Sequence, residues 1–445
     1  MKKRFLILFA LLLLALAVCL VSCDKSDTVG GQGGNTDTGN TDGGSTEGGN
    51  TEGGSTEGGD TEGGNTEGGD VHTHDFTVKA LDCKYLKGEG EFYYSCACGE
   101  KGDTAFTSED APIHDYGKDY EANATHVFLK CGGCGEIKDK KEHSLRFEKQ
   151  SDGTAKVTGL SANAAEVIIP AKYDGNTVNA IAADAFKMKI TVTSVTFPAT
   201  ITSVGAGAFN NCMSIEAVYV SDLGAWAGIA FENQSANPLS YADAFYIDGE
   251  ALGDALVLGE GVTAVGSFAF AGCAKITSVS FPSTITKIGK GAFTGCSALK
   301  KVYLADLAAW CGIDFPDVYA TPLVYASELY LGGELIVDLV IPLGVKVIHP
   351  YAFYNCQSIK NVTLSKTTTT VSTYAFMNCT ALDTFFFASS IQRIEKEAFK
   401  GCMRIDHFEY EGNMKSWRKL DKEEGWSSGS LYSYRQCQDG RPSKN

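Results

Sequence analysis

The sequence has little of what acid–base catalysis and nucleic-acid binding require. Only seven histidines occur in 445 residues, and 38 lysines and arginines face 54 aspartates and glutamates, which gives a formal net charge of −16. No basic stripe could follow a phosphate backbone, so nucleic acid is not an expected partner. No paired carboxylates, no nucleophile beside a base and no open metal site stand out, so we expect no enzymatic activity.

Residues 43–67 contain no apolar side chain. They consist of five pentapeptides, GGSTE, GGNTE, GGSTE, GGDTE and GGNTE, and residues 24–70 carry eleven carboxylates against one lysine. Such a segment cannot bury enough surface to offset the entropy of ordering it. We therefore expect a disordered stalk over residues 23–70, which carries much of the acidity of the chain.

One long apolar run is present, from Phe5 to Val18, and three basic residues precede it. This pattern is typical of an export signal, because the run is too short and wrongly flanked for an ordinary membrane span. The run is followed by LVSC, which ends at Cys23 and resembles the lipobox of bacterial lipoproteins. The resemblance implies a signal peptide over residues 1–22, a lipid on Cys23 and a membrane anchor in the bacterial cell envelope. A plain secretory signal or a membrane helix is the alternative.

Histidine and cysteine are concentrated in residues 71–144. Five histidines and five cysteines fall between His72 and His143, in two similar units that begin with HDF and HDY. Aligning these starts and the CG pairs places four ligands in each unit, the number that a tetrahedral structural zinc ion needs. The first candidate set is Cys83, Cys96, Cys98 and His114, and the second is His126, Cys131, Cys134 and His143.

The spacing of the thiols supports zinc better in the second unit than in the first. In CGGCG, Cys131 and Cys134 can reach one ion while backbone N–H groups stabilise the sulfur charge, whereas CAC has one residue between its cysteines. Because an exported chain can meet an oxidising space, the disulfides Cys131–Cys134 and Cys83–Cys96 are an alternative, and unliganded packing is another. Four protein ligands leave no position for water, so a zinc ion here would be structural.

A repeat organises the rest of the chain. The dipeptide AF recurs with its phenylalanines 23 residues apart, and two of the intervals are lengthened to 61 and 60 residues. An aliphatic residue stands five positions before each phenylalanine, and another six positions after it begins an L-x-x-L-x-L pattern that predicts one short strand per repeat. Since one repeat cannot bury such a face alone, we expect stacked repeats with apolar columns and a parallel sheet. The phenylalanines are Phe186, Phe209, Phe270, Phe293, Phe353, Phe376 and Phe399.

A cysteine follows the phenylalanine by three residues in six of the seven repeats. A catalytic thiol would occur once and beside a histidine, whereas a recurring one is explained as a small buried hydrophobe. We therefore interpret this position as part of the packing, at Cys212, Cys273, Cys296, Cys356, Cys379 and Cys402.

The repeat ITKIGKGAFTGCSALKKVYL, residues 285–304, resembles the BspA-like, treponemal-type leucine-rich repeat of bacterial surface proteins. The resemblance covers residues 145–412 and implies a strand-rich α/β solenoid with a parallel sheet on its concave face, after a small Cys/His-rich β region and the disordered linker. Two longer segments, which share D-L-x-A-W and Y-x-x-G-E, are similar to the connecting units of that family, and residues 413–445 to its closing cap. LRFEKQSDGTAKVTGL, from Leu145, predicts a hairpin at the first end.

Function must come from exposed positions, because the columns explain only the fold. Aromatic residues among polar ones on the outward side of the strands suit a protein-binding surface, and solvated strand residues are the alternative. Members of the resembled family act as adhesins, which implies a host or bacterial surface protein as the partner. A structural or carbohydrate-associated envelope protein that binds through its Cys/His-rich units is the alternative function. The candidate residues of the concave face are Ser194, Thr196, Tyr219, Ser278, Ser280, Lys301, Tyr303, Asn361, Thr363, Thr384, Phe386, His407 and Glu409.

Overall fold

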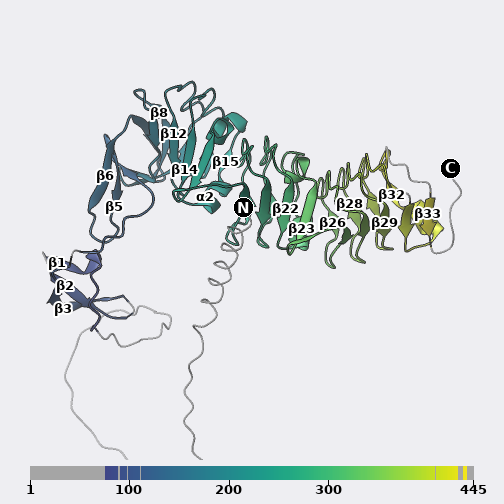
Figure 1. Ribbon diagram of the computed structural model, residues 1–445, viewed down its shortest axis with the longest axis horizontal. Coiled ribbons are helices and arrows are strands. Elements are labelled where there is room, and N and C mark those ends of the chain that lie inside the picture. The colour runs from purple at the N-terminus through teal and green to yellow at the C-terminus, as the bar shows by residue number, and fades with distance from the viewer. Residues whose placement is uncertain are drawn as a thin grey trace, which may run out of the picture. The chain divides into compact units, whose positions relative to one another are not determined.

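The computed structural model describes residues 76–88, 91–97, 99–110, 112–405, 407–428 and 434–437 (Figure 1). The expected signal peptide over residues 1–22, the expected lipid attachment at Cys23 and the expected stalk over residues 23–70 lie outside these residues, as does Cys98. Within the described part of the chain, no helix is long and apolar enough to cross a membrane.

The first Cys/His-rich unit folds as a small antiparallel sheet. A 3-10 helix, η1 (Cys83–Tyr85), leads into β1 (Leu86–Gly88), which is followed by β2 (Glu91–Ser95) and β3 (Lys101–Thr107) in the order β1-β2-β3. Phe92 on the middle strand is fully buried and stacks on Phe106 with 5.8 Å between ring centroids. A core of so few side chains is small for a stable unit, so this sheet depends on additional links.

The second Cys/His-rich unit is an extension of the first sheet of the repeats. Its strands β4 (Glu121–Ala122), β5 (His126–Lys130) and β6 (Ile137–Glu142) pair antiparallel, and β4 also pairs in parallel with β10 (Lys172–Tyr173). Ala122, Val127 and Ile168 form a small buried cluster between them. Strand pairing therefore links the second unit directly to the residues that begin the solenoid.

The hairpin predicted from Leu145 onward is confirmed. β7 (Leu145–Lys149) pairs antiparallel with β8 (Thr154–Leu160), and alternate residues of β8 are buried. The turn contains Gly153 at a φ of +82°, and Asp152 accepts a hydrogen bond of 3.0 Å from the Thr154 N–H. Both features are typical of a tight turn. β8 then pairs in parallel with β11 (Asn176–Ile181) and so covers the first repeat.

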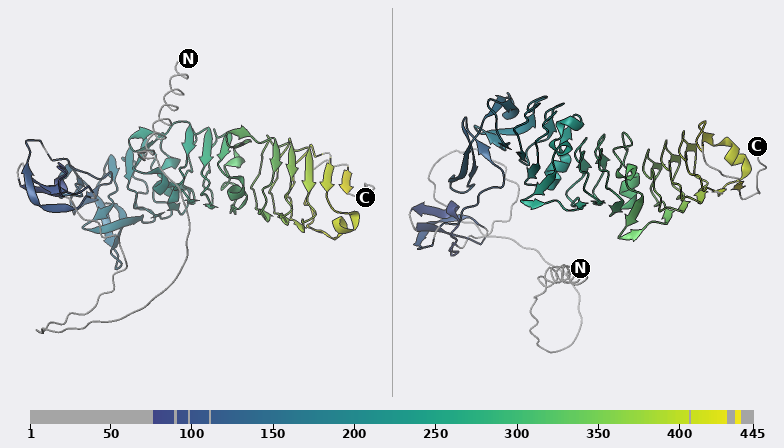
Figure 2. Two further views of the ribbon diagram at one scale, coloured as in Figure 1. Left: turned by 90° about the horizontal axis from the view of Figure 1, so that it is seen from below. Right: turned by 45° about the horizontal axis from the view of Figure 1, so that its top comes forward.

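The repeats form two ladders of strands (Figure 2). The ladder of longer strands, which we call the long ladder, carries the L-x-x-L-x-L pattern. In β22, for example, Val302 and Leu304 are buried while Lys301 and Tyr303 are partly exposed. The predicted strand-rich solenoid with a parallel sheet is therefore confirmed. The strands of this long ladder, in pairing order, are β9 (Glu166–Ile168), β12 (Ser194–Phe197), β14 (Ala217–Val220), β16 (Ala244–Ile247); then β18 (Ala255–Val257), β20 (Ser278–Phe281), β22 (Lys301–Leu304), β23 (Glu328–Leu331); then β25 (Asp338–Val340), β27 (Asn361–Thr363), β29 (Thr384–Phe387), β31 (His407–Tyr410) and β33 (Tyr434–Cys437).

The second ladder consists mostly of two-residue strands. They form three groups of paired strands. The first group continues from β11 with β13 (Ser203–Val204) and β15 (Ala230–Phe231), and the second is β19 (Ala264–Val265) with β21 (Lys287–Ile288). The third group, in pairing order, is β26 (Val347–Ile348), β28 (Thr370–Val371), β30 (Arg393–Ile394) and β32 (Asp421–Lys422). Except for β15 and β32, each ends at the aliphatic residue five positions before a repeat phenylalanine. Ile288, five positions before Phe293, is an example and is 1% exposed.

The predicted phenylalanine column lies between the two ladders. Phe353, Phe376 and Phe399 are fully buried and stack in turn, with centroid distances of 5.1 and 5.6 Å. Phe186 stacks on Phe209 at 4.9 Å. Because successive turns are one strand spacing apart, equivalent rings meet face to face and exclude water from the interior.

A short helix replaces part of the repeat in each of the longer units. Asp222 and Asp306 cap the first two helices by accepting the N–H of Ala225 and Ala309 at 2.7 Å. Each helix buries a tryptophan in the column, and the Trp310 indole N–H donates to the Ala352 carbonyl at 2.7 Å. The helices are α2 (Leu223–Gly228), α3 (Leu307–Cys311) and α4 (Met414–Lys419), and the 3-10 helices that follow the first two are η2 (Gln234–Ala236), η3 (Pro238–Ser240) and η4 (Pro322–Val324).

Two hairpins divide the long ladder into three series. β16 pairs antiparallel with β17 (Glu250–Ala251), and β23 does so with β24 (Glu334–Leu335). The returning strand occupies the edge on which the next repeat would pair, so β18 and β25 each begin a new sheet. The 23-residue period alone did not predict this division.

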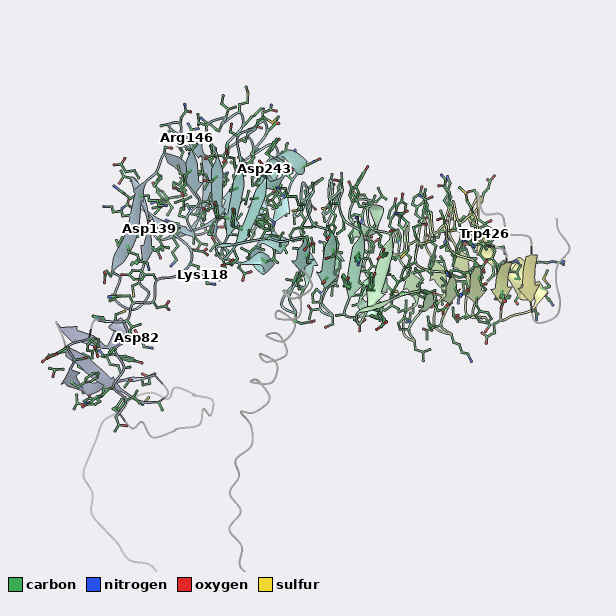
Figure 3. All side chains as sticks on the ribbon, viewed as in Figure 1. Asp82, Lys118, Asp139, Arg146, Asp243 and Trp426 are labelled. Carbon is green, nitrogen blue, oxygen red and sulfur yellow. The ribbon has the colours of Figure 1, made fainter. Side chains whose placement is uncertain are left out.

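Tryptophan also closes the column at the C-terminal end. Trp426 packs against Phe399 and Phe408 with centroid distances of 5.9 and 5.1 Å (Figure 3). Trp417 on α4 is 1% exposed, as is Trp226 on α2. Both ladders continue through β32 and β33, so residues after 412 add strands to the repeats as well as cover them.

Candidate functional site

The residues predicted for the concave face lie on strands of the long ladder, at positions that alternate with the buried residues of the apolar column. Those whose side chains are described are exposed or half-buried, and His407 lies on β31. Strand register places them in two rows, which we call the sheet face. One row contains Ser194, Ser278, Lys301, Asn361, Thr384 and His407, and the other contains Thr196, Tyr219, Ser280, Tyr303, Thr363, Phe386 and Glu409.

Two pairs of stacked tyrosines are the most distinctive feature of the sheet face. Tyr219 stacks on Tyr246 and Tyr303 on Tyr330, each pair with 4.7 Å between ring centroids and interplanar angles of 14° and 26°. Tyr246 and Tyr330 were missing from the sequence-based set. Both belong to the shared Y-x-x-G-E motif of the longer units, and the alternation in AFYIDGE and ELYLGGE could have identified them as outward strand residues.

Charged groups hold the second tyrosine pair in place. The Tyr330 hydroxyl donates to the Glu328 carboxylate at 2.7 Å, and the Lys301 ammonium lies 5.7 Å from the centre of the Tyr330 ring. The hydrogen bond to Glu328 is the main reason why the pKa of Tyr330 is raised to about 12. Tyr330 is therefore a neutral hydrogen-bond donor at physiological pH, and its orientation is restricted before any partner binds.

The sheet face adjoins a hollow of about 350 Å³ beside Tyr219. The Lys118 ammonium and the Asp248 carboxylate, which line it, form an ion pair of 2.6 Å. Tyr120 also lines the hollow and donates a hydrogen bond to Asp139 (Figure 3 labels Lys118 and Asp139). Tyr219 was singled out from the sequence, but Lys118, Tyr120 and Asp248 were not, because the hollow combines segments that are about a hundred residues apart.

The repeat cysteines contribute to packing. Cys296 is fully buried, and its thiol donates to the Phe270 carbonyl of the preceding repeat at 3.3 Å. Cys379 does the same to the Phe353 carbonyl at 3.0 Å. Burial raises the pKa of the Cys296 thiol well above its usual range, so it is neither accessible nor ionised, as a nucleophile must be.

Four of the predicted metal ligands converge on one point, and they come from both Cys/His-rich units. The ligand atoms of Cys83, His114, Cys131 and Cys134 all lie within 4.8 Å of one another. The Cys83 and Cys131 sulfurs are 3.1 Å apart, and the Cys134 sulfur is 3.3 Å from His114 Nδ1. This group, which we call the Cys/His cluster, could hold a metal ion.

Hydrogen bonds in the Cys/His cluster lower the pKa of one thiol and orient the imidazole ring, and both effects favour binding of a cation. The backbone N–H of Cys134 is the main reason why the pKa of the Cys131 thiol is lowered to about 6, while burial raises that of Cys83. Cys131 therefore loses its proton more readily than an ordinary thiol. On the other side, His114 Nε2 lies 2.9 Å from the Glu136 carboxylate, which orients the ring so that Nδ1 faces the cluster.

The remaining predicted ligands do not join this cluster. His126 Nδ1 lies 2.8 Å from the Thr125 hydroxyl, and His143 Nε2 lies 2.8 Å from the Asn123 carbonyl oxygen. Cys96 is disulfide-bonded, and Cys98 lies outside the described residues. The structure thus brings together half of each predicted set rather than either set as a whole.

The repeats match one family of proteins over more than half of the chain. The profile described as "BspA type Leucine rich repeat region" matches six copies, at residues 163–240, 250–309 and 329–420. The chain belongs to this family. BspA-type repeat proteins are cell-surface proteins, leucine-rich repeats generally mediate protein–protein interactions, and the match does not indicate a catalytic family.

Several solved structures are also similar to the chain. A leucine-rich cell surface protein from Faecalibacterium prausnitzii is 20% identical, with 64% of this chain and 98% of that one covered and a TM-score of 0.28. A leucine-rich repeat protein from Bacteroides ovatus is 19% identical, with coverages of 67% and 90% and a TM-score of 0.29. The leucine-rich repeat protein of T. pallidum is 18% identical, with coverages of 63% and 95% and a TM-score of 0.24. No curated protein matches the chain.

The BspA-type match includes the sheet face but not the Cys/His cluster. The first matched residue is 163, whereas the four ligands lie between Cys83 and Cys134. The family therefore accounts for the repeats. The chemistry of the cluster has to be argued from its own residues.

Proposed function

We propose that this protein is a lipid-anchored bacterial surface protein that binds a host or bacterial surface protein through the sheet face and so mediates adhesion. The observation that carries the proposal is the pair of tyrosine stacks on the long ladder. Tyrosine is enriched at the centres of protein interfaces, because it offers a large apolar area and a hydroxyl at a low entropic cost. The hollow beside Tyr219 would give a protruding side chain of the partner a place to enter.

The orientation of the rings favours a protein over a carbohydrate as the partner. The rings of each pair are nearly parallel, with 4.7 Å between centroids, so each ring covers one face of its neighbour. The covered faces are not available for stacking on a ligand. A sugar that stacks on an aromatic residue needs an open ring face, whereas a protein surface can pack against edges and donate to hydroxyl groups.

Removing the tyrosine stacks should weaken partner binding. For the double variants Tyr219→Ala/Tyr246→Ala and Tyr303→Ala/Tyr330→Ala, we expect the dissociation constant for immobilised host extracellular-matrix proteins or bacterial surface proteins to rise about 30-fold, as for typical hot-spot residues. Surface plasmon resonance with the purified chain would measure this.

The matched control is Tyr319→Ala, which removes a tyrosine that is 45% exposed and lies off the sheet face. This variant should bind as the unchanged protein does. If both double variants keep full affinity while their circular dichroism spectra stay native, the binding site lies elsewhere. Retention of polysaccharide by residues 76–144 would instead support a carbohydrate-associated envelope protein.

The lipid anchor is supported by the LVSC motif and by the stalk that follows it. Two or three acyl chains on Cys23 would hold the protein on the membrane, and the acidic, Gly-rich stalk would carry the repeats away from it. In the Cys23→Ala variant, we expect the protein to leave the membrane fraction of the cells, as measured by fractionation and immunoblotting. Unchanged membrane retention would contradict the anchor. Protease treatment of intact cells expressing the unchanged protein should release the repeats.

The Cys/His cluster has a structural role in this proposal. Three sulfurs and one imidazole suit Zn²⁺, which prefers four such ligands in a tetrahedron. With four protein ligands no position would remain for water or substrate, so the ion would contribute to folding rather than to catalysis.

A further inference from the structure

We propose that a single Zn²⁺, bound by Cys83, His114, Cys131 and Cys134, fastens the first Cys/His-rich unit to the second, which is itself part of the first sheet of the repeats. This inference rests on the zinc proposed above and adds where the ion acts. Cys83 comes from η1 at the start of the first unit, and Cys131 and Cys134 flank the turn after β5 in the second. Zinc would thus close a loop of 48 residues between Cys83 and Cys131.

The distances fit one tetrahedral ion. Two sulfur ligands with Zn–S bonds of about 2.3 Å lie about 3.7 Å apart in a tetrahedron. The Cys83 and Cys131 sulfurs are 3.1 Å apart, the Cys134 sulfur is 3.3 Å from His114 Nδ1, and no separation between ligand atoms of the cluster exceeds 4.8 Å. Small side-chain movements would be enough to place all four atoms around one ion.

The backbone of the second unit leaves space for Cys83, the cysteine ligand that comes from the first unit. A Cβ atom on Gly133 would lie 2.8 Å from the Cys83 sulfur and 3.1 Å from the Lys84 nitrogen, so only glycine permits the approach. Gly135 has a φ of +79° and donates its N–H to the Cys131 carbonyl at 2.9 Å, which closes the turn around the two thiols. The Glu136 carboxylate lies 2.9 Å from His114 Nε2, the ring nitrogen that does not face the cluster. These features prepare a site that spans both units.

The first unit already contains the disulfide-bonded Cys96, and a zinc ion at Cys83 would add a link from this unit to the next. Residues 76–113 form three short strands around Phe92, and a segment of about 40 residues seldom folds without a metal, a disulfide or a partner. The described contacts of Cys83 with Cys131 and Gly133 join this unit to the next one. Asp82, next to Cys83, marks this junction in Figure 3.

The test uses the purified mature chain, prepared without added metal. We expect one zinc per chain by mass spectrometry, and we expect a chelator to increase trypsin cleavage at Lys84 and Lys101 at least tenfold while the repeats stay resistant. Adding Zn²⁺ alone should restore protection. Cys83→Ser should lose both the zinc and the protection, and so should Gly133→Val, which keeps all four ligands but blocks the approach of Cys83. The control His126→Ala should keep one zinc.

Each other outcome overturns a defined part of the proposal. Two zinc ions per chain would contradict the shared site, and no zinc in a chain with native circular dichroism would contradict both the ion and the fastening. One zinc with cleavage that the chelator does not change would contradict only the fastening. None of these outcomes affects the proposal that the sheet face binds a protein, because that binding is measured with variants of Tyr219, Tyr246, Tyr303 and Tyr330.

Discussion

Replacing Phe376 with alanine should lower the free energy of unfolding of the repeats by about 3 to 5 kcal/mol. Phe376 is fully buried between Phe353 and Phe399, with interplanar angles of 14° and 3°, and the edge of Phe385 meets it at 5.1 Å. Burying such a ring contributes about 1.5 to 3 kcal/mol, and the cavity that alanine leaves adds the rest, because two stacked neighbours cannot both move into it. Urea unfolding followed by far-ultraviolet circular dichroism would measure the loss.

The matched control for Phe376 is Phe386→Ala. Phe386 belongs to β29, the strand that also carries Phe385, but its side chain points away from the column and is only partly buried. We expect this variant to lose less than about 1 kcal/mol. A loss below about 1 kcal/mol for Phe376→Ala would contradict a tightly packed phenylalanine column. Because repeat proteins can unfold in parts, the unfolding transition should be followed by a second probe as well, such as hydrogen exchange.

Replacing Trp310 with alanine should cost a similar amount, about 3 to 5 kcal/mol, for two separable reasons. The ring is fully buried and lies 5.3 Å from Phe281 and 5.1 Å from Phe315 between centroids. In addition, the indole N–H donates to the Ala352 carbonyl, 42 residues later, at 2.7 Å. Its loss removes the donor to a buried carbonyl oxygen, which costs about 1 to 3 kcal/mol.

The variant Trp310→Phe separates the two contributions to stability. It keeps an aromatic ring in the column and removes only the N–H, so we expect it to lose about 1 to 3 kcal/mol, less than Trp310→Ala. Thermal or urea unfolding of both variants under the same conditions would show the difference. Equal losses for the two substitutions would contradict a packing role for the ring. Trp226→Ala should behave like Trp310→Ala, because its indole N–H donates to the Ala269 carbonyl at 2.9 Å.

The repeat architecture could be predicted from the sequence because its determinants are local and recur. An aliphatic residue, a phenylalanine and an L-x-x-L-x-L strand recur in each repeat, with a cysteine in six of the seven, and four of the six intervals are 23 residues. Ile288, Phe293 and Cys296 are buried as their spacing predicted. The division of the long ladder could not be predicted in this way, because it depends on β17 and β24 returning to occupy a strand edge.

The sequence also identified the kinds of residue that form the Cys/His cluster, but not their grouping. Alignment of the two Cys/His-rich units placed Cys83 with Cys96 and His114, and Cys131 with His143. In the structure, Cys83 lies beside Cys131, whereas the two ring nitrogens of His143 form hydrogen bonds with the Asn123 carbonyl and the Leu145 N–H. Similarity between two units shows that both have ligands. It does not show which sulfur atoms meet, because that depends on how the units pack.

By itself, the sequence determined the family, the repeat, the apolar columns and the side of each strand that faces outward. These follow from periodicity, since every turn must bury the same face against its neighbours. Only the tertiary structure decided that Tyr219 stacks on Tyr246 and Tyr303 on Tyr330, that a hollow adjoins the sheet face, and that Cys83, His114, Cys131 and Cys134 share one site. The reason is physical: these arrangements join segments that no local pattern connects, and the packing of whole units sets their distances.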